Sequence, residues 1–191
     1  MTGRKVFSSD VMQGEPSEKA RFHRWRELHD SAVAAVDFSA SPSRRFEATF
    51  EGTTIGQITS VAMSGTLMRS VRGRSRIAGD SNDRYVLFIN LGTADMVGTQ
   101  LNRPFTMRPG GGTLMDMGEA SEVTAADDQN RWFNLMLPRP LLIGMEQKVA
   151  MPIAAQNRAL ALLHNYCRML EAEPGISDVR LIAHVLSLIH I

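Results

Sequence analysis

The sequence is poor in features that mark several common classes of protein. A single cysteine, Cys167, rules out a disulfide within the chain and is typical of a reducing compartment. No apolar run reaches the length of a membrane-spanning helix, and the first residues lack the apolar segment of a secretory signal. We therefore expect a cytoplasmic protein that makes no contact with a membrane.

Net charge is also nearly absent. The 21 basic and 20 acidic residues leave a formal charge of +1, so no bulk attraction to nucleic acid or to a membrane surface is expected. Apolar residues make up 43% and charged residues 21% of the 191 positions. This composition is typical of one globular domain with its own core and a small appendage.

Catalytic motifs are missing as well. The five histidines form no His-x-His pair on a strand and have no glutamate at ligand spacing, so we predict no metal site, no catalytic residue and no cofactor. Cys167 lies in an apolar helical pattern that is typical of an inert thiol. Strand-like residues follow Gly110 to Gly112, which favours a tight turn over a phosphate-binding loop. These absences favour a binding module over an enzyme.

What the sequence does contain is a change of hydrophobic period along the chain. Residues 1–15 are polar without periodicity and predict a flexible arm. A three-to-four-residue apolar spacing then predicts a helix that begins after Ser17, its N-cap. From about residue 44 to residue 137, short runs of period two with glycine-bearing breaks predict the antiparallel strands of a barrel or sandwich.

Helical periodicity returns after Pro138, and a second helix is predicted to begin after Ser177. The first of these helices carries an apolar seam of coiled-coil type, which is a candidate dimer interface. Its members are Leu160, Leu163, Cys167 and Leu170. Packing of the same seam onto the domain's own strands is the alternative interpretation.

Candidate ligand-binding residues come from the predicted strands. Four arginines fall within residues 69–76. On a strand, Arg72, Arg74 and Arg76 share one face, which solvent would cover in the simpler interpretation; in the other, one of them points into the barrel and pairs with an anionic ligand. Tyr85 and Trp132 would either line a cavity or fill the core. The candidate set is Arg74, Tyr85 and Trp132.

Several short motifs occur in an order that resembles a known family. In chain order they are F-x-x-W-x-E-L at 22–28, R-x-R-I-A at 74–78, DRYVLFINLG at 83–92, QLNRPFTMRPG at 100–110, LMDM at 114–117 and LMLPRPLL at 135–142. Together, over residues 16–185, they resemble the N-terminal, cupin-like effector domain of AraC/XylS-type bacterial transcription regulators.

The resemblance implies a mainly β fold with α-helices: a cupin-like antiparallel β-barrel of jelly-roll type, with an N-terminal helix and C-terminal dimerisation helices. The sensor barrel with its leading helix would span residues 16–149, and the helical dimerisation segment residues 150–185. In that family the barrel senses a small molecule or mediates dimerisation, and a C-terminal pair of helix-turn-helix units reads DNA. Two alternatives are a small cupin-like metal-dependent enzyme and a dimerisation module without an effector.

From this resemblance we expect three kinds of partner. The chain would form a homodimer, bind a small-molecule effector, and reach DNA only through a C-terminal domain that is missing from this sequence. We carry no effector contact over from the family to individual residues, because such contacts vary widely among its members.

The last six residues, LSLIHI at 186–191, form an apolar run without a helix cap. The adapter end used in transposase-based sequencing libraries translates in one frame to the same six residues. Our hypothesis is that this segment is adapter read-through, and that the natural chain continues past about Val185 into the DNA-binding module. Re-sequencing of the source locus tests this, and a genuine stop codon after Ile191 would contradict it.

Overall fold

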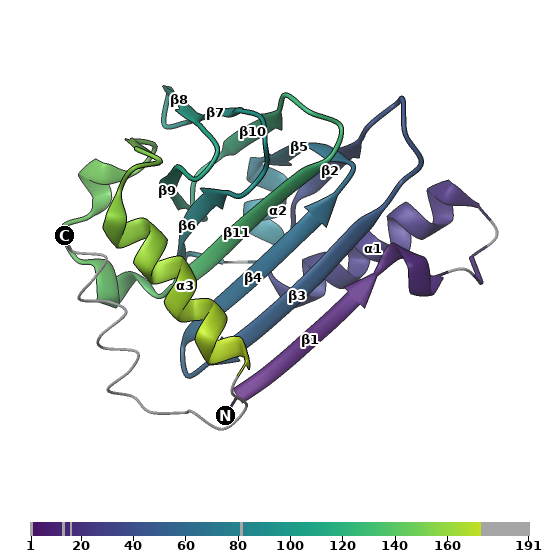
Figure 1. The fold of residues 1–191 in the computed structure, drawn as a ribbon, viewed down its shortest axis with the longest axis horizontal. Coiled ribbons are helices and arrows are strands. Elements are labelled where there is room, and N and C mark those ends of the chain that lie inside the picture. Colours follow the sequence, from purple (N-terminus) through teal and green to yellow (C-terminus); the bar gives the residue numbers. More distant parts are fainter. Residues whose placement is uncertain (1, 13, 16, 81, 173–191) are drawn as a thin grey trace.

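Two antiparallel β-sheets packed face to face form the body of the protein in the computed structural model (Figure 1). The structure describes residues 2–12, 14–15, 17–80 and 82–172. The larger sheet has seven strands, in the order β1 (Thr2–Ser8), β3 (Ala48–Ile55), β4 (Ile58–Gly65), β11 (Asn130–Leu137), β6 (Tyr85–Asn90), β9 (Gly112–Asp116) and β12 (Pro152–Ile153). The smaller sheet has five, in the order β2 (Asp37–Ala40), β5 (Leu67–Arg72), β10 (Ser121–Ala125), β7 (Met96–Gln100) and β8 (Arg103–Met107).

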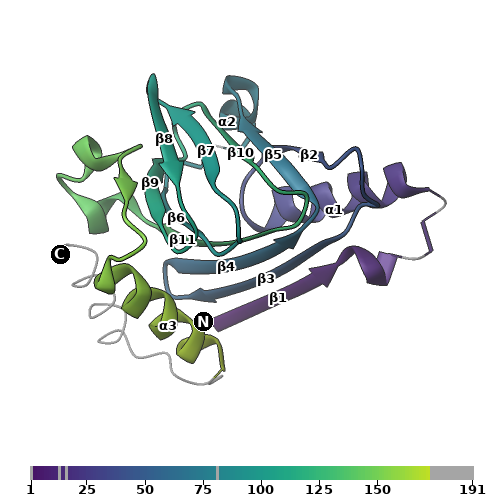
Figure 2. The same cartoon turned by 45° about the horizontal axis from the view of Figure 1, so that its top comes forward.

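Helices and short 3-10 turns are placed around the sheets. The described helices are α1 (Glu18–Ala32), α2 (Arg74–Asp80) and α3 (Arg158–Ala172), and the 3-10 turns are η1 (Ser9–Met12), η2 (Arg139–Leu142) and η3 (Glu146–Lys148). The cupin-like, jelly-roll type of fold is therefore as predicted, but the barrel is not closed. The two sheets approach each other where β8 lies beside β9, and at the opposite edge α1 lies between them (Figure 2).

Helix α1 joins the two sheets through aromatic side chains. The predicted N-cap is confirmed, because Ser17 Oγ accepts a hydrogen bond from the Ala20 N–H at 3.1 Å. Trp25 is fully buried and packs edge-on against Phe7 of β1 and Phe38 of β2, with ring centroids 6.2 Å and 5.4 Å away. One side chain thus contacts both sheets, and α1 fills the edge at which a closed barrel would have strand pairing.

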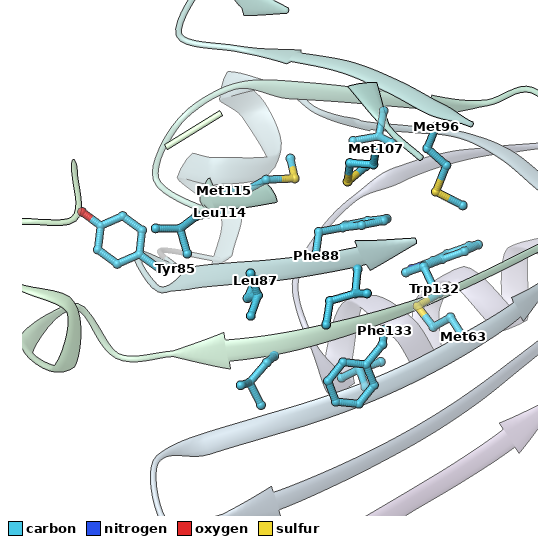
Figure 3. Packing of buried hydrophobic residues seen from close by; sticks show 14 of the residues in the cluster. Met63, Tyr85, Leu87, Phe88, Met96, Met107, Leu114, Met115, Trp132 and Phe133 are labelled. Atoms are coloured by element: carbon cyan, nitrogen blue, oxygen red, sulfur yellow. The ribbon is translucent and has the colours of Figure 1, made fainter. Parts of the chain in front are cut away.

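The central strand β11 separates two layers of side chains. Its neighbours are β4 and β6, and its residues alternate between the two faces of the larger sheet. Trp132 points to the same side as Phe88, toward the smaller sheet, and Phe133 points to the opposite side (Figure 3). There Phe133 meets His164 of α3, with ring centroids 5.0 Å apart. Helix α3 therefore covers the outer face of the strands whose inner face lies between the sheets.

The N-terminal segment differs from the prediction. Residues 2–8, expected to belong to a flexible arm, form β1 and pair antiparallel with β3, from Thr2 opposite Ile55 to Ser8 opposite Thr49. Phe7 stacks on Phe50 with ring centroids 4.4 Å apart. The segment is mostly polar because β1 is an edge strand, and the partly buried ring of Phe7 packs it against the core.

The arginine-rich segment after β5 also differs from the prediction. It was expected to continue as a strand, but residues 74–80 form α2, begun by hydrogen bonds from the N–H groups of Arg76 and Ile77 to the Gly73 carbonyl. The helix brings Asp80 back to Arg72, so one ion pair closes the segment. The helix predicted after Ser177 and the proposed read-through at 186–191 lie outside the described residues.

Truncating the aromatic contact in α1 tests its role in holding the sheets together. We expect Trp25→Ala to lower the free energy of unfolding by about 3–5 kcal/mol, because it removes a fully buried indole and leaves a cavity. The measurement is urea denaturation at neutral pH. The matched control is His23→Ala on the exposed side of the same helix, with an expected change within about 0.5 kcal/mol. Equal losses in the two variants would contradict this role.

Candidate functional site

A cavity of about 70 Å³ lies between the two sheets. Its floor is the inner face of β4, β6, β9 and β11, its roof comes from β5 and β10, and the end of α1 closes one side. Most of the lining is apolar, and four methionines contribute to it. The residues that define its apolar surface are Met63, Val86, Phe88, Met115, Met117, Val123, Trp132 and Met136.

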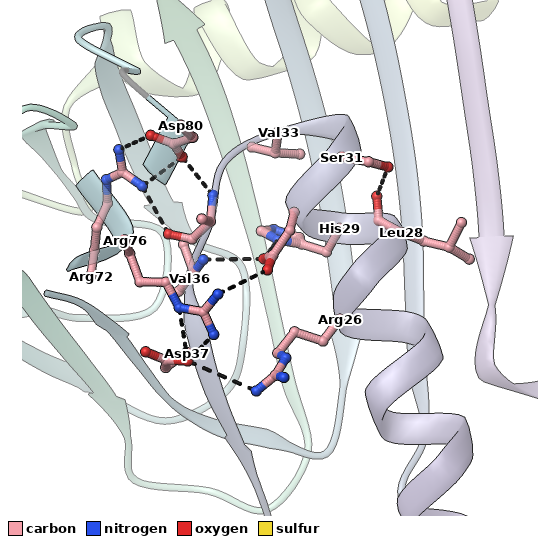
Figure 4. A network of polar contacts seen from close by, with 12 residues as sticks. Arg26, Leu28, His29, Ser31, Val33, Val36, Asp37, Arg72, Arg76 and Asp80 are labelled. Carbon is pink, nitrogen blue, oxygen red and sulfur yellow. Dashed lines mark hydrogen bonds and ion pairs between the residues drawn. The ribbon is translucent and has the colours of Figure 1, made fainter. Parts of the chain in front are cut away.

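The segment that joins α1 to β2, residues 33–36, covers one side of this cavity. Its backbone is held by side chains from other parts of the chain (Figure 4). The Ala35 N–H donates to Asp80 Oδ2 at 2.7 Å, and the Val36 N–H donates to Asp30 Oδ1 at 3.2 Å. Asn82 Nδ2 donates to the Val33 carbonyl at 3.0 Å. We call residues 33–36 the cover segment.

Arg72 is a positively charged residue that lines this cavity, and none of its hydrogen-bond donors is free. Its side chain is 2% exposed and lines the cavity. Its Nε donates to the Met117 carbonyl, Nη1 to the Ala35 carbonyl and Asp80, and Nη2 to Asp80 and the Asn82 carbonyl, at 2.7–3.3 Å. A guanidinium has five N–H groups, and these five contacts use them all. Arg72 therefore acts on the fold and does not offer a free charge to a ligand.

The Arg72–Asp80 ion pair changes the acidity of the carboxylate. Burial alone would raise the pKa of Asp80, but hydrogen bonds from Arg72 and from the N–H groups of Asn82 and Ala35 outweigh burial and lower that pKa to about 2. The ionised pair is thus the stable form of the folded state. It contributes about 2 kcal/mol of stability above pH ~4, and this contribution is lost as the pH falls toward 2.

A second ion-pair group lies outside the first. Arg76 of α2 contacts Asp37 of β2 through two nitrogens, one of them 3.0 Å from Oδ1, and contacts Asp30 of α1 at 3.4 Å. Arg26 lies 3.8 Å from the same Asp37 oxygen. The Arg76 guanidinium holds the pKa of Asp37 below its usual value. Together these contacts tie α1, α2 and β2 around the cover segment (Figure 4).

Two polar atoms at the cavity have no hydrogen-bond partner among the described residues: His29 Nδ1 and Asn134 Oδ1. His29 is 3% exposed, and the oxygen of Asp30 near its Nδ1 is 3.7 Å away, beyond hydrogen-bond distance. Burial lowers the pKa of His29 below its ordinary value, although Asp30 acts in the opposite direction. The imidazole is therefore neutral at physiological pH. A buried polar atom without a partner costs stability, which is typical of a site that awaits a ligand.

The structure separates the three residues predicted to bind a ligand. Trp132 lines the cavity. Tyr85 does not line the cavity, and its hydroxyl accepts a hydrogen bond from Arg139 at 3.1 Å. Arg74 is exposed on α2 and lines a separate surface hollow of about 450 Å³ beside Gln100 and Glu119. The inward-pointing arginine suggested by the sequence is Arg72, and its partner is Asp80 rather than an anionic ligand.

The candidate dimer residues are placed as follows. Leu160, Leu163 and Cys167 are buried in the chain's own core, at 5%, 2% and 5% exposed, which is the alternative that the sequence left open. The side chain of Leu170 lies outside the described part. A dimer contact through α3 therefore stays a prediction. It would use the exposed face of the helix, where Leu162 is 54% and Met169 66% exposed.

Sequence reasoning missed His29, Asn134, Arg72 and the methionines as members of the site. For Asn134 a signal was present, because period-two alternation from Trp132 puts it on the same strand face as Met136. For Arg72 and His29 the signals were weak: Arg72 is one of several arginines of which one could point inward, and His29 lies four residues after Trp25, at helical spacing. Among the residues with described positions, no group of three His, Cys, Asp or Glu side chains is arranged to hold a metal ion. No helix in the described part is long and apolar enough to cross a membrane.

The two facing sheets, the helix between their edges and the apolar cavity between them define a cupin-like domain. The family model described as AraC-binding-like domain matches residues 25–190, so the chain belongs to this family. The resemblance seen in the sequence is thereby confirmed. Membership supports a role as a regulatory domain of an AraC-type factor.

Three solved structures are similar to this chain to different degrees, and the first of them shows the same fold. The crystal structure of the AraC-like transcriptional activator CuxR is similar with a TM-score of 0.75 at 17% identity, over 98% of this chain and 68% of that one. The cupin domain of Schizosaccharomyces pombe Cnp3 gives a TM-score of 0.39 at 13% identity, over 52% of this chain and 72% of that one. A Cupin 2 conserved barrel domain protein from Salinispora arenicola gives a TM-score of 0.35 at 10% identity, over 57% of this chain and 79% of that one. No curated protein matches the sequence.

Removing the charge on Asp80 tests the buried ion pair. We expect Asp80→Asn to lower the free energy of unfolding by about 3 kcal/mol at pH 7, because Arg72 would remain charged and buried without a counter-ion. Urea denaturation measures the loss. The control is Asp83→Asn, whose side chain is 80% exposed and 4.0 Å from Arg139, with an expected change within about 0.5 kcal/mol. A loss for Asp80→Asn as small as that of the control would contradict the assignment.

The buried histidine predicts a pH dependence of stability. Because the folded-state pKa of His29 is lowered, the unfolded chain takes up a proton near pH 6.5 while the folded chain does not. The free energy of unfolding should therefore fall as the pH drops below about 6.5, measured by urea denaturation between pH 7.5 and 5. Burial and two arginines also lower the pKa of His164, so both His29→Gln and His164→Gln are compared with wild type. A slope unchanged in His29→Gln would contradict the prediction.

Proposed function

We propose that this chain is the effector-sensing and dimerisation domain of an AraC-type transcription regulator in the cytoplasm. It is not an enzyme in this proposal. DNA recognition would belong to a helix-turn-helix domain outside this sequence. The observation that carries the proposal is that the cavity and helix α3 lie on opposite faces of the same strand, β11.

That placement gives a physical route from ligand to helix. Trp132, Asn134 and Met136 of β11 line the cavity, and Phe133, next to Trp132, contacts His164 of α3 on the outer face. A ligand that moves the inner side chains displaces the strand, and the strand carries the outer ring with it. The effect on α3 requires only that the ligand bind one arrangement of β11 more tightly than the other.

A sensor also needs a path by which the ligand enters its cavity, and the cover segment lies at such a path. Its N–H groups donate hydrogen bonds to Asp80 and Asp30, and its carbonyls accept hydrogen bonds from Arg72 and Asn82. These bonds can break and re-form without unpacking either sheet. We therefore place the opening of the cavity at residues 33–36, beside the end of α1.

The dimerisation part of the proposal is tested at the exposed face of α3. Leu162 and Met169 lie seven residues apart, two helical turns on one side of the helix. We expect the double variant Leu162→Glu/Met169→Glu to weaken self-association at least about tenfold, because each charge would be desolvated in the contact. Sedimentation velocity over a concentration series measures it.

The matched control is Ala161→Glu, which adds one charge to an exposed position on another side of the same helix. It should leave the association unchanged. A wild-type chain that stays monomeric at all concentrations, or a double variant that associates as strongly as wild type, would overturn a dimer formed through this face.

A further inference from the structure

We propose that the cavity binds a small, uncharged aromatic molecule that carries one hydrogen-bond donor, such as a phenolic hydroxyl or a ring N–H. This inference rests on the proposed sensing function and specifies the class of effector. Four features of the cavity lead to it: its size, its lining, the absence of an available charge and the position of one buried acceptor.

Size limits the ligand to about one ring. The cavity measures about 70 Å³, and on this scale a single water needs roughly 10–15 Å³, so the space holds roughly five water-sized groups. A second hollow of about 20 Å³ shares Phe38, Phe88 and Trp132 with the first. These three rings separate the two spaces, and rotation of one of them would join the spaces for a slightly larger ligand.

The lining favours a flat, polarisable molecule. Phe88 and Trp132 lie nearly parallel, with an interplanar angle of 11° and ring centroids 6.2 Å apart, and present their faces to the space between the sheets (Figure 3). Methionines surround them, of which Met63 and Met115 come from two different strands. Thioethers make favourable contacts with aromatic rings, and their three rotatable bonds let the wall adapt to the ligand.

Charge is excluded by the groups that line the cavity. All five N–H groups of Arg72 are used by Asp80 and three backbone carbonyls, so an anion would find no free donor there. Desolvation keeps His29 neutral. Asp80 is itself paired with Arg72, so a cation would find no free carboxylate at this wall. A charged ligand would lose its hydration and would meet only neutral groups, such as the hydroxyls of Ser70 and Ser121.

One hydrogen-bond donor on the ligand has a defined partner. Asn134 Oδ1 lies on the same face of β11 as Trp132, is buried, and has no partner within the described chain. This oxygen can only accept, so a ligand that bonds to it must donate. His29 also lines the cavity and is 3% exposed. Its Nδ1 is a second buried atom without a partner among the described residues.

Phenol, toluene and benzoate form a matched probe series at pH 7.5. Phenol and toluene have almost the same shape, but only phenol donates a hydrogen bond; benzoate has the same ring and a negative charge. We expect phenol to bind about tenfold more tightly than toluene, and benzoate not to bind. Affinity is measured by calorimetry on the whole chain, and location by methyl resonances of ¹³C-labelled methionines. Signals of Met63, Met115, Met117 and Met136 should shift, whereas that of exposed Met169 should not.

The variant Asn134→Leu tests the acceptor directly. It replaces the amide with an apolar side chain of similar volume, so phenol would lose its partner while toluene would not. We expect the order of affinity to invert, with toluene binding more tightly than phenol, because the hydroxyl would be buried without a hydrogen bond. An order unchanged from wild type would overturn the role of Asn134. The wild-type probe series remains decisive if this variant does not fold.

The remaining outcomes separate the ligand class from the sensing function. If benzoate shifts the four methionine signals and phenol does not, the proposed class is wrong and sensing in this cavity stands. If none of the three probes shifts them, the proposed class is overturned. Sensing itself would then be overturned only if a wider set of anionic, cationic and aliphatic molecules also left these signals unchanged.

Discussion

A buried ion pair between Arg72 and Asp80 is the interaction on which the site depends. It joins the end of β5 to the end of α2, and the same two side chains hold both the N–H and the carbonyl of Ala35. A guanidinium that is 2% exposed is stable only when every donor is used. The hydrogen bonds that use the donors of Arg72 therefore favour three features together. These are the helical form of residues 74–80, the position of the cover segment and the absence of a free charge at the cavity.

The cavity is a compromise between stability and binding. Its apolar walls belong to the same core that stabilises the two sheets, and Trp132 serves both. The unpartnered atoms of His29 and Asn134 lower the stability of the empty domain, since each was desolvated on folding without a compensating hydrogen bond. Asn134 is thus a polar side chain in a mostly apolar wall, and its oxygen is available to a bound ligand.

The sequence allowed the architecture to be predicted because alternation with a period of two reports which face of a strand is buried. The same rule failed at residues 74–76, where arginines alternate but the backbone turns into α2. It also failed at residues 2–8, a mostly polar segment that forms an edge strand with one partly buried ring, Phe7.

The site was harder to predict than the fold. Trp132 was named, whereas Asn134 was not, although its register on β11 places it on the same face of the strand. The burial of Arg72 and His29 depends on partners that are distant in sequence or lie on other elements, such as Met117 and Phe38. The seam of α3 was recognised as apolar, but its period cannot distinguish a partner helix from the chain's own sheet. Phe133 and its neighbours on the outer face of β11 are the reason that Leu160, Leu163 and Cys167 are buried within the chain.

The position of β11 has a consequence for biosynthesis. This strand lies between β4 and β6, yet it follows β6 in the chain by about 40 residues. While a ribosome is still extending the chain, β4 and β6 each have an open, apolar edge, and such edges promote aggregation. The nascent domain thus has no hollow to occupy until residue 137 has emerged. A molecule that fits there can therefore stabilise only chains in which β11 is already in place between β4 and β6.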